Sequence, residues 1–187
     1  MFYHASPVGG LQVLRPHVSE QGEAMVYFSS CRENTLVYLG DPVGRFCRAA
    51  GIPLALPCPK WATYGFDCAG IQVLEEYYPG YLEETFGGAA GYIYRVETVP
   101  GGRPLTGLLG DVATPEPVRV AGTEFIPDAL RALEQADREN RIHLRRYETL
   151  PERMLAFIEK TVRQEYEAAA HPGYRAFLRA KFPFLRS

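Results

Sequence analysis

Short extended segments and helical segments are separated along this chain, and that separation constrains its fold more than any other feature. Before Thr149, β-branched and aromatic residues recur in short runs bounded by Gly and Pro, which is typical of strands and turns. After it, apolar residues recur at helical spacing, at Met154, Leu155, Ile158, Val162 and Tyr166. Strands first and helices late predict an α+β fold with mostly antiparallel strands. We expect a core over residues 1–148 and a helical C-terminal segment, 149–187, packed on it.

Local signals place the individual elements. Alternation and β-propensity predict strands over 1–6, 26–28, 92–96 and 141–148, a paired 61–66 and 71–79, and further strand over 115–126, interrupted at 122. Helical signals predict helices over 81–86, 127–140 and 173–185, with Pro127 in a first turn. Ser29 or Ser30 is expected to cap a short helix reaching Tyr38, and Thr149 with Glu152 to form a capping box.

Composition excludes several classes of protein. With 47% hydrophobic and 22% charged residues, the chain is typical of an ordinary globular protein rather than a disordered one. A net charge of −2 argues against binding nucleic acid through phosphate neutralisation alone, and the late arginines alternate with glutamates as on a solvated helical face. The first residues lack a signal-peptide pattern, and no run approaches about 20 apolar residues, so we expect a cytoplasmic protein without a membrane span.

The four cysteines are widely and irregularly spaced, at positions 31, 47, 58 and 68. No Cys-x-x-Cys pair occurs, so the sequence predicts neither a zinc site nor a redox motif. We expect reduced thiols that pack as small apolar side chains.

The segment MVYFSSCRENTLVY, residues 25–38, joins a predicted strand to a predicted helix and carries a tyrosine on each. Tyr27 lies on the strand and Tyr38 follows eleven residues later. Aromatic residues in such places fill a core more often than they bind a ligand. Two tyrosines from adjacent elements can also form the two walls of a slot for a flat ring. The residues alone leave both interpretations open.

This segment and the preceding FYHASPVGGLQVLRP together resemble the opening of the ADP-ribosyltransferase superfamily, in its diphtheria-toxin-like and poly(ADP-ribose) polymerase-like branch. Those proteins carry a His-Gly(-Ser) element on a first strand, then Gly-Ile-Tyr-Phe on a strand and Ser-Ala-Asn-Tyr on a helix. Their two tyrosines keep the interval of Tyr27 and Tyr38. The resemblance covers about the first 40 residues and a patch at GTEFI, and it implies a split, mostly antiparallel β-sheet core. It further implies NAD as a substrate.

Several small residues acquire roles from this resemblance. His4 would bond the ribose that carries the adenine, and the backbone of Ala5 would hold the nicotinamide amide with help from Thr35. Ser6 and Ser29 complete the set that we expect to contact NAD. Ala5 replaces the glycine of the family, so a backbone approach there is more crowded.

The tyrosines and a glutamate would carry the chemistry. Tyr38 would stack on the nicotinamide ring, Tyr27 would close its other side, and Glu124 would bond a ribose hydroxyl and polarise the acceptor. A carboxylate beside a developing oxocarbenium ion acts electrostatically, most strongly where water is excluded, and closure of a Gly- and Pro-rich loop over 40–59 is one way to exclude it. Other acidic residues near late strands remain alternatives to Glu124: Glu97, Glu116 and Glu148.

Three functions follow as hypotheses. The first is NAD-dependent ADP-ribosyl transfer to an unidentified protein, nucleic acid or small molecule, or NAD hydrolysis, with release of nicotinamide. The second is the RNA 2′-phosphotransferase branch of the same superfamily, although the core strands lack an evident arginine cluster for phosphates. The third is a catalytically inactive binding module, for which the aromatic segments EEYYPGYLEETF and GYIYR offer a partner surface.

Overall fold

The computed structural model describes residues 1–18, 23–53, 61–105 and 110–186. In this part of the chain an antiparallel main sheet has the strand order β11-β7-β1-β4-β9-β8, and β3 pairs with β4. Its strands are β1 (Phe2–Ser6), β3 (His17–Val18), β4 (Ala24–Ser29), β7 (Gly91–Val96), β8 (Arg103–Pro104), β9 (Asp111–Thr114) and β11 (Gly122–Ile126). The antiparallel α+β architecture expected from the sequence is therefore confirmed.

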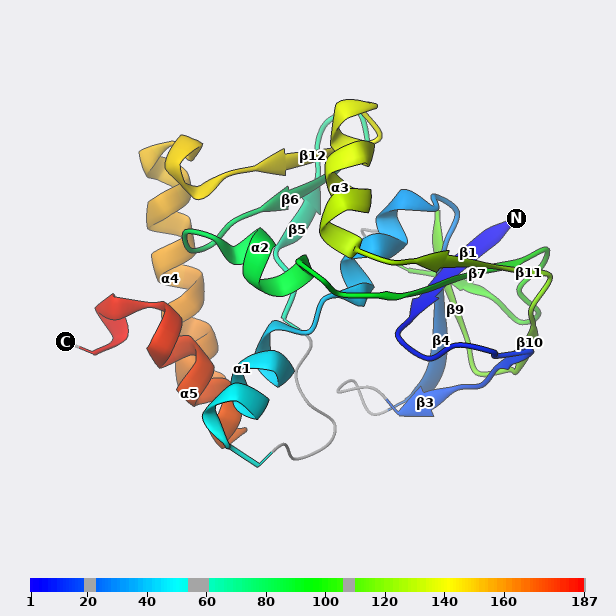
Figure 1. Ribbon diagram of the computed structural model, residues 1–187, viewed down its shortest axis with the longest axis horizontal. Helices are drawn as coiled ribbons and strands as arrows, with labels where there is room; N and C mark the ends of the chain where they lie inside the picture. The colour runs from blue at the N-terminus through cyan, green and yellow to red at the C-terminus, as the bar shows by residue number, and fades with distance from the viewer. Residues whose placement is uncertain (19–22, 54–60, 106–109, 187) are drawn as a thin grey trace.

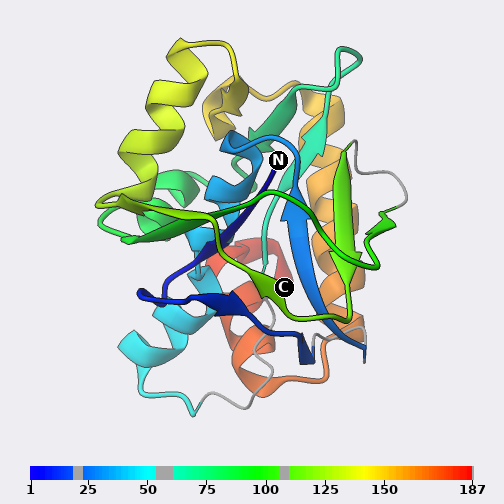
Figure 2. The same ribbon diagram turned by 90° about the vertical axis from the view of Figure 1, so that its right-hand side faces the viewer.

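The main sheet divides between β1 and β4. β1 pairs with β7 along its whole length, from Phe2 opposite Val96 to Ser6 opposite Tyr92. It pairs with β4 at Tyr3 opposite Ser29 and then diverges from it. Figure 1 shows β1, β7 and β11 running across the view while β4 and β9 run nearly upright, and Figure 2 shows the same crossing from the side. The sheet thus consists of two ladders that meet at a single point.

Two smaller sheets and the helices complete the fold. β2 (Val13–Leu14) pairs with β10 (Val118–Arg119), and β6 (Gln72–Glu75) lies between antiparallel β5 (Tyr64–Phe66) and parallel β12 (Ile142–Arg145). The helices are η1 (Glu33–Leu39), α1 (Pro42–Ala50), α2 (Tyr81–Phe86), α3 (Ala129–Arg138), η2 (Tyr147–Thr149), α4 (Glu152–Ala168), α5 (Pro172–Lys181) and η3 (Pro183–Leu185). Within the described ranges, no helix has the length and apolarity that a membrane span requires.

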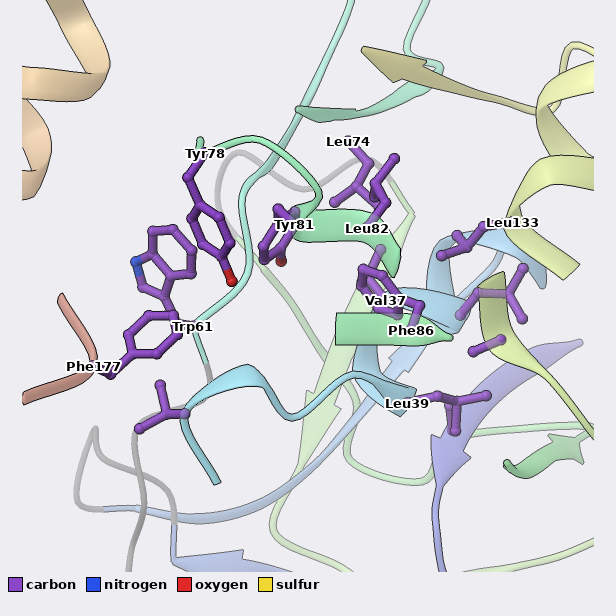
Figure 3. Close-up of a cluster of buried hydrophobic side chains, with 14 of the residues drawn as sticks. Val37, Leu39, Trp61, Leu74, Tyr78, Tyr81, Leu82, Phe86, Leu133 and Phe177 are labelled. Atoms are coloured by element: carbon purple, nitrogen blue, oxygen red, sulfur yellow. The ribbon is translucent and has the colours of Figure 1, made fainter. Parts of the chain in front are cut away.

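Apolar side chains form two cores. The large core joins η1, α1, α2, α3, α4 and α5 and contains the aromatic cluster of Trp61, Tyr78, Tyr81 and Phe177 (Figure 3). The small core lies on the other face of the main sheet and consists of Leu14, Val26, Phe28, Tyr94, Val96 and Val118. Because α4 and α5 contribute Ile158, Val162 and Phe177 to the large core, the C-terminal helices pack directly against the earlier elements.

Many of the expected elements form where the sequence places them. α2 has the expected bounds, β5 and β6 pair, and β11, α3 and β12 lie within the predicted ranges, while β7 begins one residue earlier than predicted, at Gly91. The final helix also forms, with His171 as its N-cap residue.

Three local expectations are wrong. The segment 40–59 is not all loop, because Asp41 caps α1 by accepting the backbone N–H of Gly44 and Pro42 occupies the first helical turn; residues 54–60 lie outside the described part. η1 begins at Glu33 without a side-chain cap, so neither Ser29 nor Ser30 caps it. α4 begins after Pro151, and the hydroxyl of Thr149 instead donates to the carbonyl of Arg146, so no capping box forms there.

Candidate functional site

Strand β4 and the helix η1 that follows it form the centre of the candidate site. Val26 and Phe28 belong to the small core, and successive strand residues point to opposite faces, so Tyr27 and Ser29 point to the other face. η1 packs on this face, in contact with β1, β4 and β7. Tyr27 and Tyr38 therefore come from a strand and a helix that pack together, as the sequence predicted.

Tyr38 makes its polar contact with a residue that sequence reasoning missed. Its hydroxyl shares a 2.7 Å hydrogen bond with the hydroxyl of Tyr64 from β5, and the two rings meet edge to face at 6.2 Å between centroids. Burial raises the pKa of Tyr38, and the neighbouring Tyr64 and Asp111 raise it further. Tyr38 is therefore a neutral phenol that can donate a hydrogen bond and offer an aromatic face.

The side chain of His4 does not share the face of Tyr27 and contacts the site through a main-chain carbonyl. Its Nδ1 lies 2.9 Å from the carbonyl oxygen of Tyr27, and its ring lies 5.8 Å from that of Phe28. In the β1–β7 ladder His4 lies opposite Tyr94, a member of the small core, so strand alternation directs its side chain away from the face of Tyr27. The imidazole thus lies where β1 and β4 diverge, bonded to the strand that carries Tyr27.

The small residues of the predicted site are already buried or hydrogen-bonded within the protein. Ala5 is buried on the η1 side of β1, opposite Ile93. The Ser6 hydroxyl accepts the backbone N–H of Val8 at 3.1 Å, and the Ser29 hydroxyl accepts that of Cys31 at 3.2 Å. Thr35 is buried, and its hydroxyl donates to the carbonyl of Arg32 at 2.7 Å, inside the first turn of η1. These hydroxyls keep further lone pairs, so each can still accept a bond.

Glu124 lies on the exposed strand β11 and forms an ion pair with Arg32. In the register it is opposite Ile93, which places it on the η1 side of the sheet. Nε of Arg32 donates to Oε2 of Glu124 at 2.8 Å, and Nη2 donates to Oε1 at 2.5 Å. The carboxylate is half exposed, so the structure brings Glu124 to the start of η1 but holds it in a two-pronged contact with a guanidinium.

Asp111 is a second carboxylate on this face, which sequence reasoning missed. It begins β9 and lies opposite Ser29, so its side chain shares the face of Ser29 and Tyr27. The residue is only 6% exposed, and its Oδ1 has no hydrogen-bond partner in the described part of the chain. Burial raises the pKa of Asp111, while a hydrogen bond with the Ser29 hydroxyl opposes the change. A buried carboxylate oxygen without a donor is rare, because its desolvation is not compensated.

Two further charges surround Arg32. Glu33 is buried and accepts a hydrogen bond from Arg141 at 2.8 Å and a longer one, at 3.4 Å, from Arg32. Burial alone would raise the pKa of Glu33, but the bond from Arg141 and the charge of Arg32 outweigh it and lower the pKa. The main partner of Glu33 is thus Arg141, and the main partner of Arg32 is Glu124.

The face between β4, β9 and η1 therefore gathers two phenols, a hydroxyl and a buried acid: Tyr27, Tyr38, Ser29 and Asp111. Such a set can hold a flat cationic ring between aromatic surfaces and place a carboxylate beside it. Metal chemistry has no comparable support, since residues 1–18, 23–53, 61–105 and 110–186 contain no cluster of three or more His, Cys, Asp or Glu suited to a metal ion. Cys31, Cys47 and Cys68 are free thiols, but only Cys47 is buried and Cys68 is exposed, so the expected packing holds in part; Cys58 lies outside the described residues.

Comparison with known proteins yields no matching family model, no matching curated protein and no matching solved structure. The site must therefore be interpreted from its own geometry.

Proposed function

We propose that this protein binds NAD and catalyses cleavage of its nicotinamide–ribose bond, transferring ADP-ribose to an acceptor or to water. The observation that carries the proposal is the buried carboxylate of Asp111, which lies on the same face as Tyr27 and beside Tyr38 and whose Oδ1 has no hydrogen-bond partner among the described residues. The resemblance of residues 2–38 to the opening of ADP-ribosyltransferases supports the same substrate.

The site residues suit a cationic pyridine ring. Aromatic faces attract a cation electrostatically, and a slot between Tyr27 and Tyr38 would orient the ring by stacking. The positive ring would also compensate the buried charge of Asp111, whose Oδ1 has no donor in the described chain. A hydroxyl of the ribose or the amide of the nicotinamide could supply that donor.

The proposed reaction needs a carboxylate close to the reacting carbon. The bond from ribose C1′ to the ring nitrogen breaks and its electron pair moves to that nitrogen, which makes nicotinamide neutral. A lone pair of the acceptor hydroxyl, or of water, forms the new bond to C1′, and the proton of that hydroxyl passes to the carboxylate. A carboxylate also stabilises the positive charge that develops on the ribose, most strongly in a site shielded from water.

Asp111 fits this role better than Glu124 does. It is buried with an unsatisfied oxygen, whereas Glu124 is half exposed and paired with Arg32. Its raised pKa also favours acceptance of a proton. We therefore propose Asp111 as the reacting carboxylate, and the sequence-based assignment to Glu124 becomes the competing hypothesis.

Two measurements test the proposal. NAD should raise the Tm of the purified protein, because a ligand that binds the native state stabilises it. Incubation with NAD should release nicotinamide, and Asp111→Asn should lower that rate by about 10²- to 10⁴-fold without lowering the Tm. Glu97→Gln and Glu116→Gln, which change exposed acids near the same strands, serve as matched controls and should leave the rate unchanged.

The outcomes separate the alternatives. Loss of nicotinamide release in Glu124→Gln, with Asp111→Asn fully active, would return the catalytic role to Glu124. Binding of ADP-ribose without any release of nicotinamide would favour the inactive binding module. A protein whose Tm does not respond to NAD would contradict the proposed function altogether.

A further inference from the structure

We infer that Arg32 binds the diphosphate of the dinucleotide substrate, and that Glu124 occupies this guanidinium when no substrate is bound. The inference rests on the proposed function and adds a second role at the same site, the recognition of an anion. It also gives Glu124 a role different from the catalytic one that the sequence suggested.

The contact between the two side chains has the geometry that a guanidinium offers to a phosphate. Nε and Nη2 of Arg32 each donate to a different oxygen of Glu124, at 2.8 and 2.5 Å. This parallel, two-pronged arrangement is common to arginine–carboxylate and arginine–phosphate pairs. A phosphate that approached the same edge of Arg32 would therefore replace Glu124 without a change in the donor groups.

The surroundings allow such an exchange. The side chains of Arg32 and Glu124 are 28% and 50% exposed, and ion pairs of this kind are weak because water screens them. Glu33, the other acid near Arg32, takes its shorter bond from Arg141. Release of Glu124 would therefore leave Arg32 with little compensating charge and available to an incoming anion.

The main chain keeps Arg32 close to the site during the exchange. Its carbonyl accepts both the backbone N–H of Thr35, at 3.1 Å, and the Thr35 hydroxyl, at 2.7 Å. Arg32 thus stays at the start of η1, three residues after Ser29, while its side chain is free to change partners. It is also the only basic residue between Ala24 and Leu39, the segment that carries both tyrosines.

A cation is needed here for an electrostatic reason. The diphosphate of NAD is negatively charged, and the buried carboxylate of Asp111 on the same face would repel it. A guanidinium on the connection between β4 and η1 would offset that repulsion. Glu124 would neutralise the same guanidinium in the absence of ligand.

The test compares ligands with and without phosphate. Affinities for NAD and for nicotinamide are measured by titration calorimetry at low salt for the wild type, Arg32→Ala, Arg32→Lys and Glu124→Gln. Arg32→Ala should weaken the affinity for NAD by about 10- to 100-fold and leave the affinity for nicotinamide unchanged. Arg32→Lys should lose less, because it keeps the charge without the fork. Glu124→Gln should strengthen the affinity for NAD, because it removes the negative charge that competes with the diphosphate for Arg32.

Arg163→Ala and Glu159→Gln are matched controls. Nε and Nη2 of Arg163 both donate to Oε1 of Glu159, and the two side chains are 45% and 50% exposed. This pair lies on α4, away from the candidate site. These variants should bind NAD as the wild type does.

Three results would overturn the inference. Unchanged NAD affinity in Arg32→Ala would show that Arg32 does not contact the diphosphate. Equal losses of affinity for NAD and for nicotinamide would assign Arg32 a purely structural role. Unchanged or weaker NAD affinity in Glu124→Gln would exclude the exchange. Each of these requires that the wild type binds NAD, so a wild type without NAD affinity would instead reject the proposed function and the inference together.

Discussion

The helical end, around α2, α4 and α5, and the sheet end, around β4, β9 and η1, each bury an acid, and these two acids differ in their hydrogen bonds. At the helical end, Glu76 is 1% exposed and accepts bonds from the backbone N–H groups of Leu82 and Tyr147 and from the guanidinium of Arg146. At the sheet end, Asp111 is 6% exposed, and one of its oxygens accepts nothing from the described residues. Figure 1 places the two regions on opposite sides of η1. A satisfied buried acid stabilises a structure, whereas an unsatisfied one is typical of a functional site.

The surroundings of these acids differ in the same sense. The helical end holds a continuous aromatic cluster in which the Trp61 ring lies 5.4 Å from Phe177 and 6.2 Å from Tyr78 (Figure 3). The sheet end has the smaller core and a sheet that diverges between β1 and β4. We therefore expect the helical end to supply most of the stability, while the candidate site lies at the sheet end.

Truncation of the aromatic cluster should have the largest effect. Phe177 is fully buried and packs against Trp61, Phe46 and Tyr78, so Phe177→Ala should cost about 3–5 kcal/mol in the free energy of unfolding. Urea unfolding at 25 °C measures this loss. The exposed Phe157 on α4 is the control, and Phe157→Ala should change stability by less than about 0.5 kcal/mol. Equal losses for the two variants would contradict our division of the molecule.

The order of elements was predictable from the sequence because it depends on local patterns. Alternation over Gly91–Val96 and helical spacing over Glu152–Ala168 each lie within one segment. The failure at α1 was also local. Asp41 followed by Pro42 is a helix-start signal, but the density of Gly and Pro around it favoured a loop instead.

The site was only partly predictable because its polar contacts join distant segments. Local propensity correctly placed Tyr27 on a strand and Tyr38 on the helix that follows it. Nothing local shows that Asp111 pairs with Ser29 across β4 and β9, or that Glu124 meets Arg32, which lies 92 residues away. The burial of a carboxylate depends on sheet register, and register is a tertiary property.

A substitution at Glu33, at the sheet end, should give the second largest effect. Its pKa is lowered in the folded protein, so its ionised form stabilises the fold above the unfolded pKa, near 4.5, and that contribution disappears as the pH falls through the lower folded pKa. Glu33→Gln should therefore cost about 1–2 kcal/mol at pH 7. Unfolding midpoints of variant and wild type should converge as the pH falls through the lowered folded pKa of Glu33. A constant difference at all pH values would show that the bonds of Glu33 do not depend on its charge.

Substitution of Asp111 should give the smallest change in the free energy of unfolding, and this change should be opposite in sign to that for Glu33. Its pKa is raised in the folded protein, so the protonated form favours folding below the unfolded pKa, near 3.8, and this contribution is lost as the pH rises through the folded pKa. Asp111→Asn removes the buried charge and should raise stability at pH 7 by about 1 kcal/mol, or about 2–4 °C in Tm. The gain should vanish near pH 3, where the wild-type acid is protonated in both states.

This sign is what distinguishes a site residue from a structural one. Where an acid only supports the fold, its replacement by the amide lowers the stability of the protein, as expected for Glu33. Where an acid serves binding or chemistry, the same replacement raises the stability of the ligand-free protein. Thermal unfolding of Asp111→Asn between pH 3 and pH 8 measures the difference. A variant less stable than the wild type at pH 7 would mean that Oδ1 of Asp111 has a donor in the folded protein. The contrast with Glu76, and with it the assignment of the site to the sheet end, would then fail.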